Sequence, residues 1–205
     1  IIFAILLNEL KNEKFKKTIQ TISYLPHFLS WVVVSGLLVA LLSTDNGLLN
    51  VLRGFFGKEP IMYLGDPKYF RKVLVLSDIW KGIGWGSIVY LAAISGVDQE
   101  LYEAAYMDGA SRWRRIWHIT LPSISNIVVI MLIFSVGGLL NAGFEQIFLL
   151  YSPSVYNVAD IIDTFVYREG LISNNYSYAT AVGLFKSLVS MVLLLLTNFI
   201  AKQLD

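Results

Sequence analysis

The sequence has no cysteine and only two histidines, His27 and His118, in 205 residues. The absence of cysteine excludes disulfides, thiolate metal sites and cysteine nucleophiles. The two histidines lie in separate segments without a Glu or His at ligand spacing, so no metal site is expected. Charged residues make up 15% of the chain and the net charge is +1, which gives no support for nucleic-acid binding.

The patterns of common catalytic sites are missing as well. The sequence has no Gly-x-x-x-x-Gly-Lys-Ser/Thr run, so the chain is not expected to bind ATP through a P-loop of its own. It also lacks a Ser/His/Asp arrangement or a paired-carboxylate motif that would indicate a membrane hydrolase or glycosidase. The sequence therefore predicts no catalytic residue, and a membrane enzyme is not favoured.

The chain does contain long apolar segments, and hydrophobic residues make up 56% of it. A helix needs roughly 20 mostly apolar residues to cross a bilayer, where irregular backbone is too costly. Four segments meet this length with at most two charges each: 22–42, 73–97, 124–141 and 178–201. Residues 1–7 resemble the tail of a further helix, so residue 1 is not expected to be the native start. The prediction is an all-α integral membrane protein with one domain, residues 1–205.

Basic residues indicate the orientation, because Lys and Arg are enriched in short cytoplasmic loops. Four lysines precede the first full span, and alternate crossings place the loop at 98–122 and the terminal Lys202 on the same side. We therefore expect this loop and the C-terminus in the cytoplasm. The outer loops are then residues 43–72 and 144–178. The 43–72 loop is an exception to the charge rule, because it holds five basic residues. The 144–178 loop is rich in aromatic residues, which is typical of a membrane interface.

The loop at 98–122 carries one specific pattern. It reads Glu103-Ala104-Ala105, three residues, Gly109, nine residues, and then Ile119-Thr120-Leu121-Pro122. Good helix formers precede Asp108-Gly109, which is a typical helix stop, and Ser111 can cap a second short helix. Pro122 suits the first turn of the next span, where its missing N–H costs nothing. The local prediction is a helix, a sharp turn and a second helix.

This pattern resembles the EAA loop of the permease subunits of ABC importers, with every element at the family's spacing. The resemblance implies a coupling helix that sits in a cleft of a cytoplasmic ATPase subunit. Small alanines would allow close approach, Glu103 would offer a polar contact, and Gly109 would supply the bend. The arginines either contact the ATPase or snorkel to lipid head groups. The residues implied for coupling are Glu103, Ala104, Ala105, Asp108, Gly109, Ile119, Leu121 and Pro122, with Arg112, Arg114 and Arg115.

Two further runs, 77–86 and 143–151, are similar to permeases for complex carbohydrates, in the polysaccharide-uptake branch. The resemblance implies a type I ABC-importer transmembrane domain with a six-helix core, of which this chain lacks the first helix and most of the second. It implies a pore-forming subunit for oligosaccharides or polysaccharide fragments in a bacterial inner membrane. The chain would have no cofactor, since ATP and Mg²⁺ would bind the ATPase. The implied partners are a second homologous permease, which would make a heterodimer, ABC ATPase subunits, an extracytoplasmic solute-binding protein and membrane lipids. A permease for another solute class, such as amino acids, and a secondary transporter remain alternatives.

Ionisable residues at membrane depth are costly and are therefore candidates for the substrate path. Asp78 and Lys81 lie three residues apart on one helical face, where they either neutralise each other or contact substrate. Trp85 follows one turn later and offers a ring on which a sugar could stack. On the same span, three glycines at 82, 84 and 86 predict close helix packing.

The later spans hold three more path candidates. Asn141 and Glu145 lie four residues apart, so both are expected at one cavity. Lys186 is the only charge of the last span and has three interpretations: snorkelling outward, pairing with Glu145, or binding an acidic sugar. In the first full span, Pro26 predicts a kink or the start of the helix.

Overall fold

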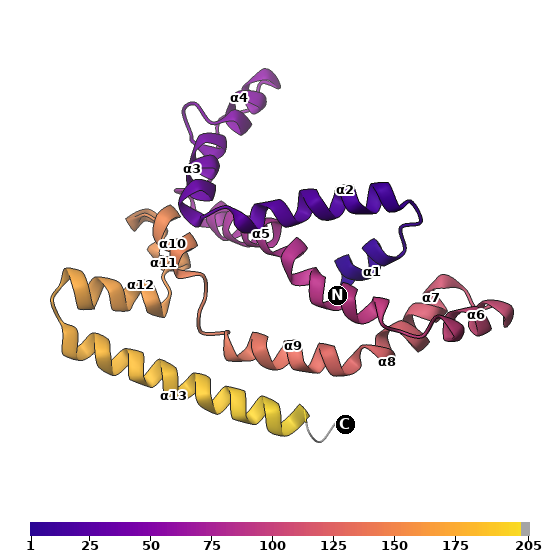
Figure 1. Ribbon diagram of the computed structural model, residues 1–205. Coiled ribbons are helices and arrows are strands. Elements are labelled where there is room, and N and C mark those ends of the chain that lie inside the picture. Colours follow the sequence, from indigo (N-terminus) through magenta and orange to yellow (C-terminus); the bar gives the residue numbers. More distant parts are fainter. Residues whose placement is uncertain (202–205) are drawn as a thin grey trace. The chain divides into compact units, whose positions relative to one another are not determined.

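The structure is a computed structural model that describes residues 1–201, and every regular element in this part of the chain is a helix (Figure 1). The α-helical prediction is confirmed. The elements are α1 Ile2–Asn8, α2 Glu13–Tyr24, η1 Leu25–Phe28, α3 Trp31–Leu42, α4 Leu48–Phe55, α5 Pro67–Ser95, α6 Gln99–Met107, α7 Arg112–Arg115, η2 Ile116–Thr120, α8 Leu121–Ser123, α9 Ser125–Gly137, α10 Phe144–Leu150, η3 Pro153–Val155, α11 Tyr156–Ala159, α12 Ile162–Tyr167, η4 Arg168–Ile172 and α13 Tyr176–Ala201. Lys202, on which the orientation of the C-terminus partly rested, lies outside the described residues.

Two of the four predicted spans are continuous helices. The 73–97 span lies within α5, apart from its last two residues, and the 178–201 span coincides with α13 except that the helix begins two residues earlier. By length and composition, α13 is the one helix in residues 1–201 that could cross a membrane alone. The number rises to three when each of two interrupted helix pairs, α2 to α3 and α7 to α9, is counted as one span.

The other two predicted spans need correction. Residues 22–42 are not one helix, because α2 ends at Tyr24 and a 3-10 turn at Leu25–Phe28 precedes α3. Pro26 lies in that turn, so the kink it predicted is a full interruption of the helix. The span at 124–141 is shorter than predicted, because α9 ends at Gly137.

The chain forms two compact units, each built from separate stretches. The first contains residues 1–27, 80–136 and the chain from Thr197, and the second contains residues 28–79 and 137–196. The core of the first unit joins Ala4 and Leu7 of α1 to Leu91 and Ile94 of α5, together with Val97 and Ile124.

A close contact between α2 and α5 also belongs to the first unit. A Cβ atom added at Gly84 would overlap the backbone oxygen of Ser23, whereas one added at Gly82 or Gly86 would meet no atom within 4 Å. The predicted packing role is therefore confirmed for Gly84, where only hydrogen leaves room for the neighbouring backbone.

The core of the second unit contains Phe70, Leu150, Val155 and Ala159. A buried amide, Gln146, ties α10 to α5: its Nε2 donates to the backbone oxygen of Leu74 and to Ser77 Oγ, both at 2.8 Å. Asn50 on α4 plays a similar part in the 43–72 loop, since its Nδ2 donates to the backbone oxygen of Ile61 and its Oδ1 accepts from the Ile61 amide. Asn50 thereby satisfies backbone groups of an irregular segment that has no helical partners for them.

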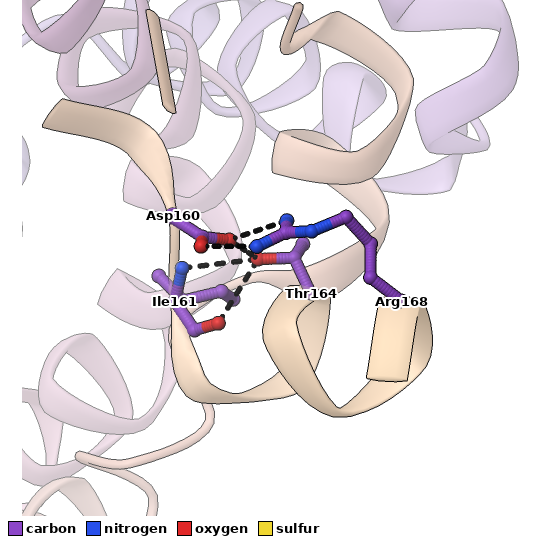
Figure 2. Close-up of polar contacts among 4 residues, drawn as sticks. All are labelled: Asp160, Ile161, Thr164 and Arg168. Carbon is purple, nitrogen blue, oxygen red and sulfur yellow. Dashed lines mark hydrogen bonds and ion pairs between the residues drawn. The ribbon is translucent and has the colours of Figure 1, made fainter. Parts of the chain in front are cut away.

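Figure 2 shows a polar cluster that holds the 144–178 loop together. Both guanidinium nitrogens of Arg168 donate to the carboxylate of Asp160, at 2.8 and 2.5 Å, and the Thr164 hydroxyl donates to the same carboxylate. The Arg168 hydrogen bonds, together with the smaller effect of Thr164, hold the pKa of Asp160 below its usual value despite partial burial. The bidentate geometry is the strong form of such a pair, so it fixes the turn that leads into α12.

Candidate functional site

The predicted coupling segment folds as the sequence indicated. Helix α6 begins after Asp98, whose side chain accepts from the Glu100 amide at 3.0 Å. At its other end the Gly109 amide donates to the Tyr106 oxygen and the Ala110 amide donates to the Ala105 oxygen, at 3.0 and 2.9 Å. These two bonds form a Schellman motif, which needs a left-handed residue at its C′ position. Gly109 occupies that position with φ +73°.

The second short helix, α7, starts where predicted. The Ser111 hydroxyl accepts from the Arg114 amide at 3.4 Å. A π-helical stretch, η2, continues from α7 into α8, and Pro122 lies near the end of this Arg112–Ser123 helix. The predicted helix, turn and helix are present, with Ser111 as a cap. The predicted place of Pro122 is wrong: it lies before a 66° bend and not in the first turn of the next span, because α9 begins at Ser125.

The side chains of the coupling segment divide into two groups. Glu103, Ala104, Asp108, Arg112 and Arg114 are exposed. Others face the body of the first unit: Ile119 packs on its core, with Leu121 half-buried beside it. Within the predicted set, the exposed residues are therefore placed for an external contact, and the hydrophobic residues after the turn are placed to attach the segment.

A tyrosine that the sequence analysis did not single out strengthens this attachment. The hydroxyl of Tyr102 lies 2.9 Å from Thr120 Oγ1, and Thr120 is buried. The bond joins α6 to η2 across 18 residues of chain. It links the two helical parts of the segment, before and after the Gly109 turn, so that they can move together.

Arg115 differs from its two neighbouring arginines because it is half-buried. Its guanidinium lies over the Tyr106 ring at 5.9 Å, and its buried Nε has no hydrogen-bond partner. This position is typical of an arginine that packs by its planar face, so Arg115 contributes to the shape of the segment.

Five large hydrophobic side chains of the 98–122 segment are exposed although none was predicted as a site residue. The three next to the Gly109 turn are the most exposed, with Tyr106 at 69%, Met107 at 84% and Trp113 at 72%. Leu101 and Trp117 are the other two. Exposed apolar groups that gather on a polar loop indicate a protein-binding surface.

Two of the substrate-path candidates contact His27 at the break after α2. Lys81 Nζ donates to the His27 backbone oxygen at 2.9 Å. The Trp85 ring stacks on the His27 imidazole with centroids 4.5 Å apart and planes 1° from parallel. The sequence suggested neither contact, since His27 lies more than fifty residues away. Asp78 is exposed on α5 in the second unit, and its proposed pairing with Lys81 stays a prediction.

The second unit contains an open cavity of about 650 Å³ beside α12 and α13. Asn141 and Lys186 line this cavity, whereas Glu145 is exposed on the first turn of α10 and is not part of the lining. Lys186 pairs with Asp163 on α12, with Nζ 2.5 Å from Oδ1, and not with Glu145. Asp163 was missed because it lies 23 residues before Lys186 on a separate short helix, and no sequence period connects the two helices.

The all-helical fold and the long apolar helix α13 are typical of an integral membrane protein. The whole sequence, residues 1–205, matches the family described as binding-protein-dependent transport system inner membrane component. The chain belongs to this family, so it is a multi-pass inner-membrane transport component and not an enzyme.

Individual relatives agree with this assignment. The chain is 49% identical to the polygalacturonan/rhamnogalacturonan transport system permease protein YteP of Bacillus subtilis, over 99% of this chain and 63% of the relative. It is 47% identical to the protein LplB of the same organism, over 100% of this chain and 64% of that one. The chain thus spans less than two thirds of the length of these relatives.

A solved structure shows the same fold. It is a bacterial ABC transporter involved in the import of the acidic polysaccharide alginate, with 42% sequence identity and a TM-score of 0.96 over 98% of this chain and 71% of that one. A second structure of a bacterial alginate ABC transporter, in complex with an alginate pentasaccharide-bound periplasmic protein, gives the same score and identity. The predicted type I importer fold is confirmed.

Proposed function

We propose that this chain forms half of the pore of an ATP-driven importer for acidic oligosaccharides, with the 98–122 segment as its contact to the ATPase. The observation that carries the proposal is the Glu103–Pro122 segment: an ordered helix-turn-helix, attached to the core at one end and exposed at the other. The names of the relatives, which concern polygalacturonan and alginate, support the acidic substrate class. An amino-acid permease is disfavoured by the same relatives.

The attachment of the segment supports its role in transmitting force. The Tyr102–Thr120 bond joins the two halves of the segment, and Tyr102 and Ile119 pack on the core that α1 and α5 form with Ile124 in the first unit. A movement of the ATPase would therefore displace helices of the membrane domain, and not a loose loop. The exposed Tyr106, Met107 and Trp113 supply apolar contact area at the proposed interface. Glu103 and Arg112 supply charge at its rim.

The mechanism we propose is alternating access. A loaded solute-binding protein docks on the outer loops 43–72 and 144–178, and ATP closes a pair of ATPase subunits below. The coupling segments of this chain and of a homologous second permease, in a heterodimer, transmit the closure and open the path outward. Hydrolysis of ATP, with its Mg²⁺, takes place on the ATPase and resets the path inward. The 98–122 segment and the C-terminus then face the cytoplasm.

The test is uptake by the full-length complex in proteoliposomes. Labelled oligogalacturonates, neutral oligosaccharides of the same length and amino acids are supplied with the cognate binding protein and internal ATP. We expect uptake of the acidic oligosaccharides and none when the ATPase is inactivated. Uptake that persists without ATP hydrolysis would indicate a secondary transporter, and uptake of amino acids alone would overturn the substrate class.

A further inference from the structure

The cavity of the second unit combines the groups that an acidic sugar needs. Its lining includes the Phe144 and Tyr167 rings, the Asn141 amide, the Thr180 hydroxyl and the ammonium group of Lys186. Aromatic faces can cover the apolar face of a pyranose ring, and amide and hydroxyl groups can bond its hydroxyls. The ammonium is the one group among these that distinguishes a sugar carboxylate from a neutral sugar.

The aromatic part of the cavity is fixed in place. The Phe144 and Tyr167 rings have centroids 6.0 Å apart, and Phe148 meets Tyr167 edge-on at 4.8 Å. Both contacts belong to the favourable tilted and T-shaped classes. A ring held on two sides loses little freedom when a ligand stacks on it, which lowers the entropic cost of binding.

The ammonium group of Lys186 is paired with the side chain of Asp163, which can rotate away from it. Lys186 Nζ lies 2.5 Å from Asp163 Oδ1, and the side chains are 14% and 27% exposed. Removing one member of a well-buried ion pair is costly because the other charge remains uncompensated. Another carboxylate that enters the cavity restores the compensation, whereas a neutral sugar cannot.

We propose that Lys186 is the subsite for the carboxylate of a uronate residue, and that Asp163 is an exchangeable counter-ion which occupies Lys186 between substrates. The inference rests on the proposed function and names the residue pair that would select acidic substrates. The uronate carboxylate replaces Asp163 at the ammonium, and the freed Asp163 turns to water through the open side of the cavity. Because one carboxylate replaces another, the exchange is close to balanced and the sugar is not held too tightly for release, as a transport path requires.

The test compares an oligogalacturonate with its methyl ester, which has the same rings and length without the charge. Uptake of both is measured in the full-length complex with Lys186→Gln, Lys186→Arg, Asp163→Asn and the double change Asp163→Asn/Lys186→Gln. Loading of the binding protein with each ligand is measured separately, so that differences between variants arise in the membrane subunit.

We expect Lys186→Gln to lower acid uptake by about ten- to a hundredfold, as for a lost hydrogen bond to a charged group, with little effect on the ester. Lys186→Arg should keep most of the preference for the acid. Asp163→Asn should keep acid uptake and lower its apparent KM, because the competing carboxylate is gone. The double variant, which leaves no unpaired charge, should assemble normally and transport acid and ester alike.

A purely structural ion pair gives a different result. Lys186→Gln and Asp163→Asn would then reduce assembly and the uptake of both ligands to the same extent, and the double variant would recover both, which would overturn the inference. The proposed function fails in a distinguishable way: the unaltered complex would import neither the acid nor the ester, and the inference would fall with it.

Discussion

The bend at Gly109 allows a sharp test of coupling, because the chain contains a second glycine in the same backbone setting. Gly57 follows α4 with φ +65°, and Gly109 follows α6 with φ +73°. Each closes a Schellman motif, since the Gly57 and Lys58 amides donate to the Gly54 and Arg53 oxygens as their counterparts do after α6. A Cβ added at either glycine meets no atom within 4 Å.

Valine at either glycine therefore introduces backbone strain without a steric overlap. The left-handed conformation costs an L-residue about 1–2 kcal/mol, and a β-branched residue is the least suited to it. Asparagine tolerates the same conformation better. We expect Gly109→Val and Gly57→Val to weaken the helix end by the same amount, and the two Asn variants to weaken it less.

The two sites should differ in function. In proteoliposomes with the full complex, Gly109→Val should abolish ATPase stimulation and uptake while the binding protein keeps its affinity for sugar. Gly57→Val lies in the 43–72 loop that we propose for docking of the binding protein, so it should keep the ATPase bound to the complex and keep basal ATP hydrolysis, whereas Gly109→Val should release the ATPase. Equal loss of the bound ATPase in both variants would show that the effect is one of general stability, and normal uptake in Gly109→Val would remove the segment from the coupling mechanism.

Three further changes test packing and charge. Gly84→Ala should prevent assembly because its Cβ overlaps the backbone of α2, while Gly82→Ala, with open space, should leave the thermal stability unchanged. Gln146→Leu should lower the free energy of unfolding by about 1–3 kcal/mol, since it removes the two buried hydrogen bonds that Gln146 donates from α10 to α5; an unchanged melting temperature would contradict this role. Arg168 lowers the pKa of Asp160, so the carboxylate stabilises the fold above its unfolded pKa of about 4 and loses this effect as pH falls through the lower folded pKa. The Asp160→Asn variant should thus be less stable than the unaltered chain at pH 7, and the difference in the free energy of unfolding should disappear at acidic pH.

The local features of the coupling segment were predictable because short-range rules determine them. The cap at Ser111 and the stop at Gly109 each depend on neighbours within five residues. The same rules explain why the span at 22–42 was wrong. The segment has no Asp, Glu, Lys or Arg and is mostly apolar, and hydropathy alone does not register that Pro26 lacks an amide donor and interrupts the helix.

Contacts between distant segments could not be predicted in this way. Gln146 reaches Leu74 across 72 residues, and its run reads as an ordinary amphipathic segment. The Tyr102–Thr120 bond joins the residue just before the recognised pattern to a position inside it that the pattern leaves unspecified. Hydrophobic periodicity indicates which face of a helix is buried, but it does not indicate which polar group of a neighbouring helix that face contacts. The local conformation of the 98–122 segment can therefore be predicted from a single sequence, whereas its contacts with the rest of the chain cannot.

The two lysines of the predicted spans show how partners decide between structure and transport. Both are costly at membrane depth, and the structure gives each an oxygen at short range. Lys81 binds a backbone carbonyl of His27 beside a helix break, where unsatisfied carbonyls need a donor; that oxygen is part of the main chain and cannot leave without rebuilding the turn. Lys186 binds the side chain of Asp163 in an open cavity, where one torsion releases it. The main-chain partner of Lys81 favours a packing role for that lysine, whereas in our proposal the side-chain partner of Lys186 is exchangeable and makes Lys186 the position at which a charged sugar competes.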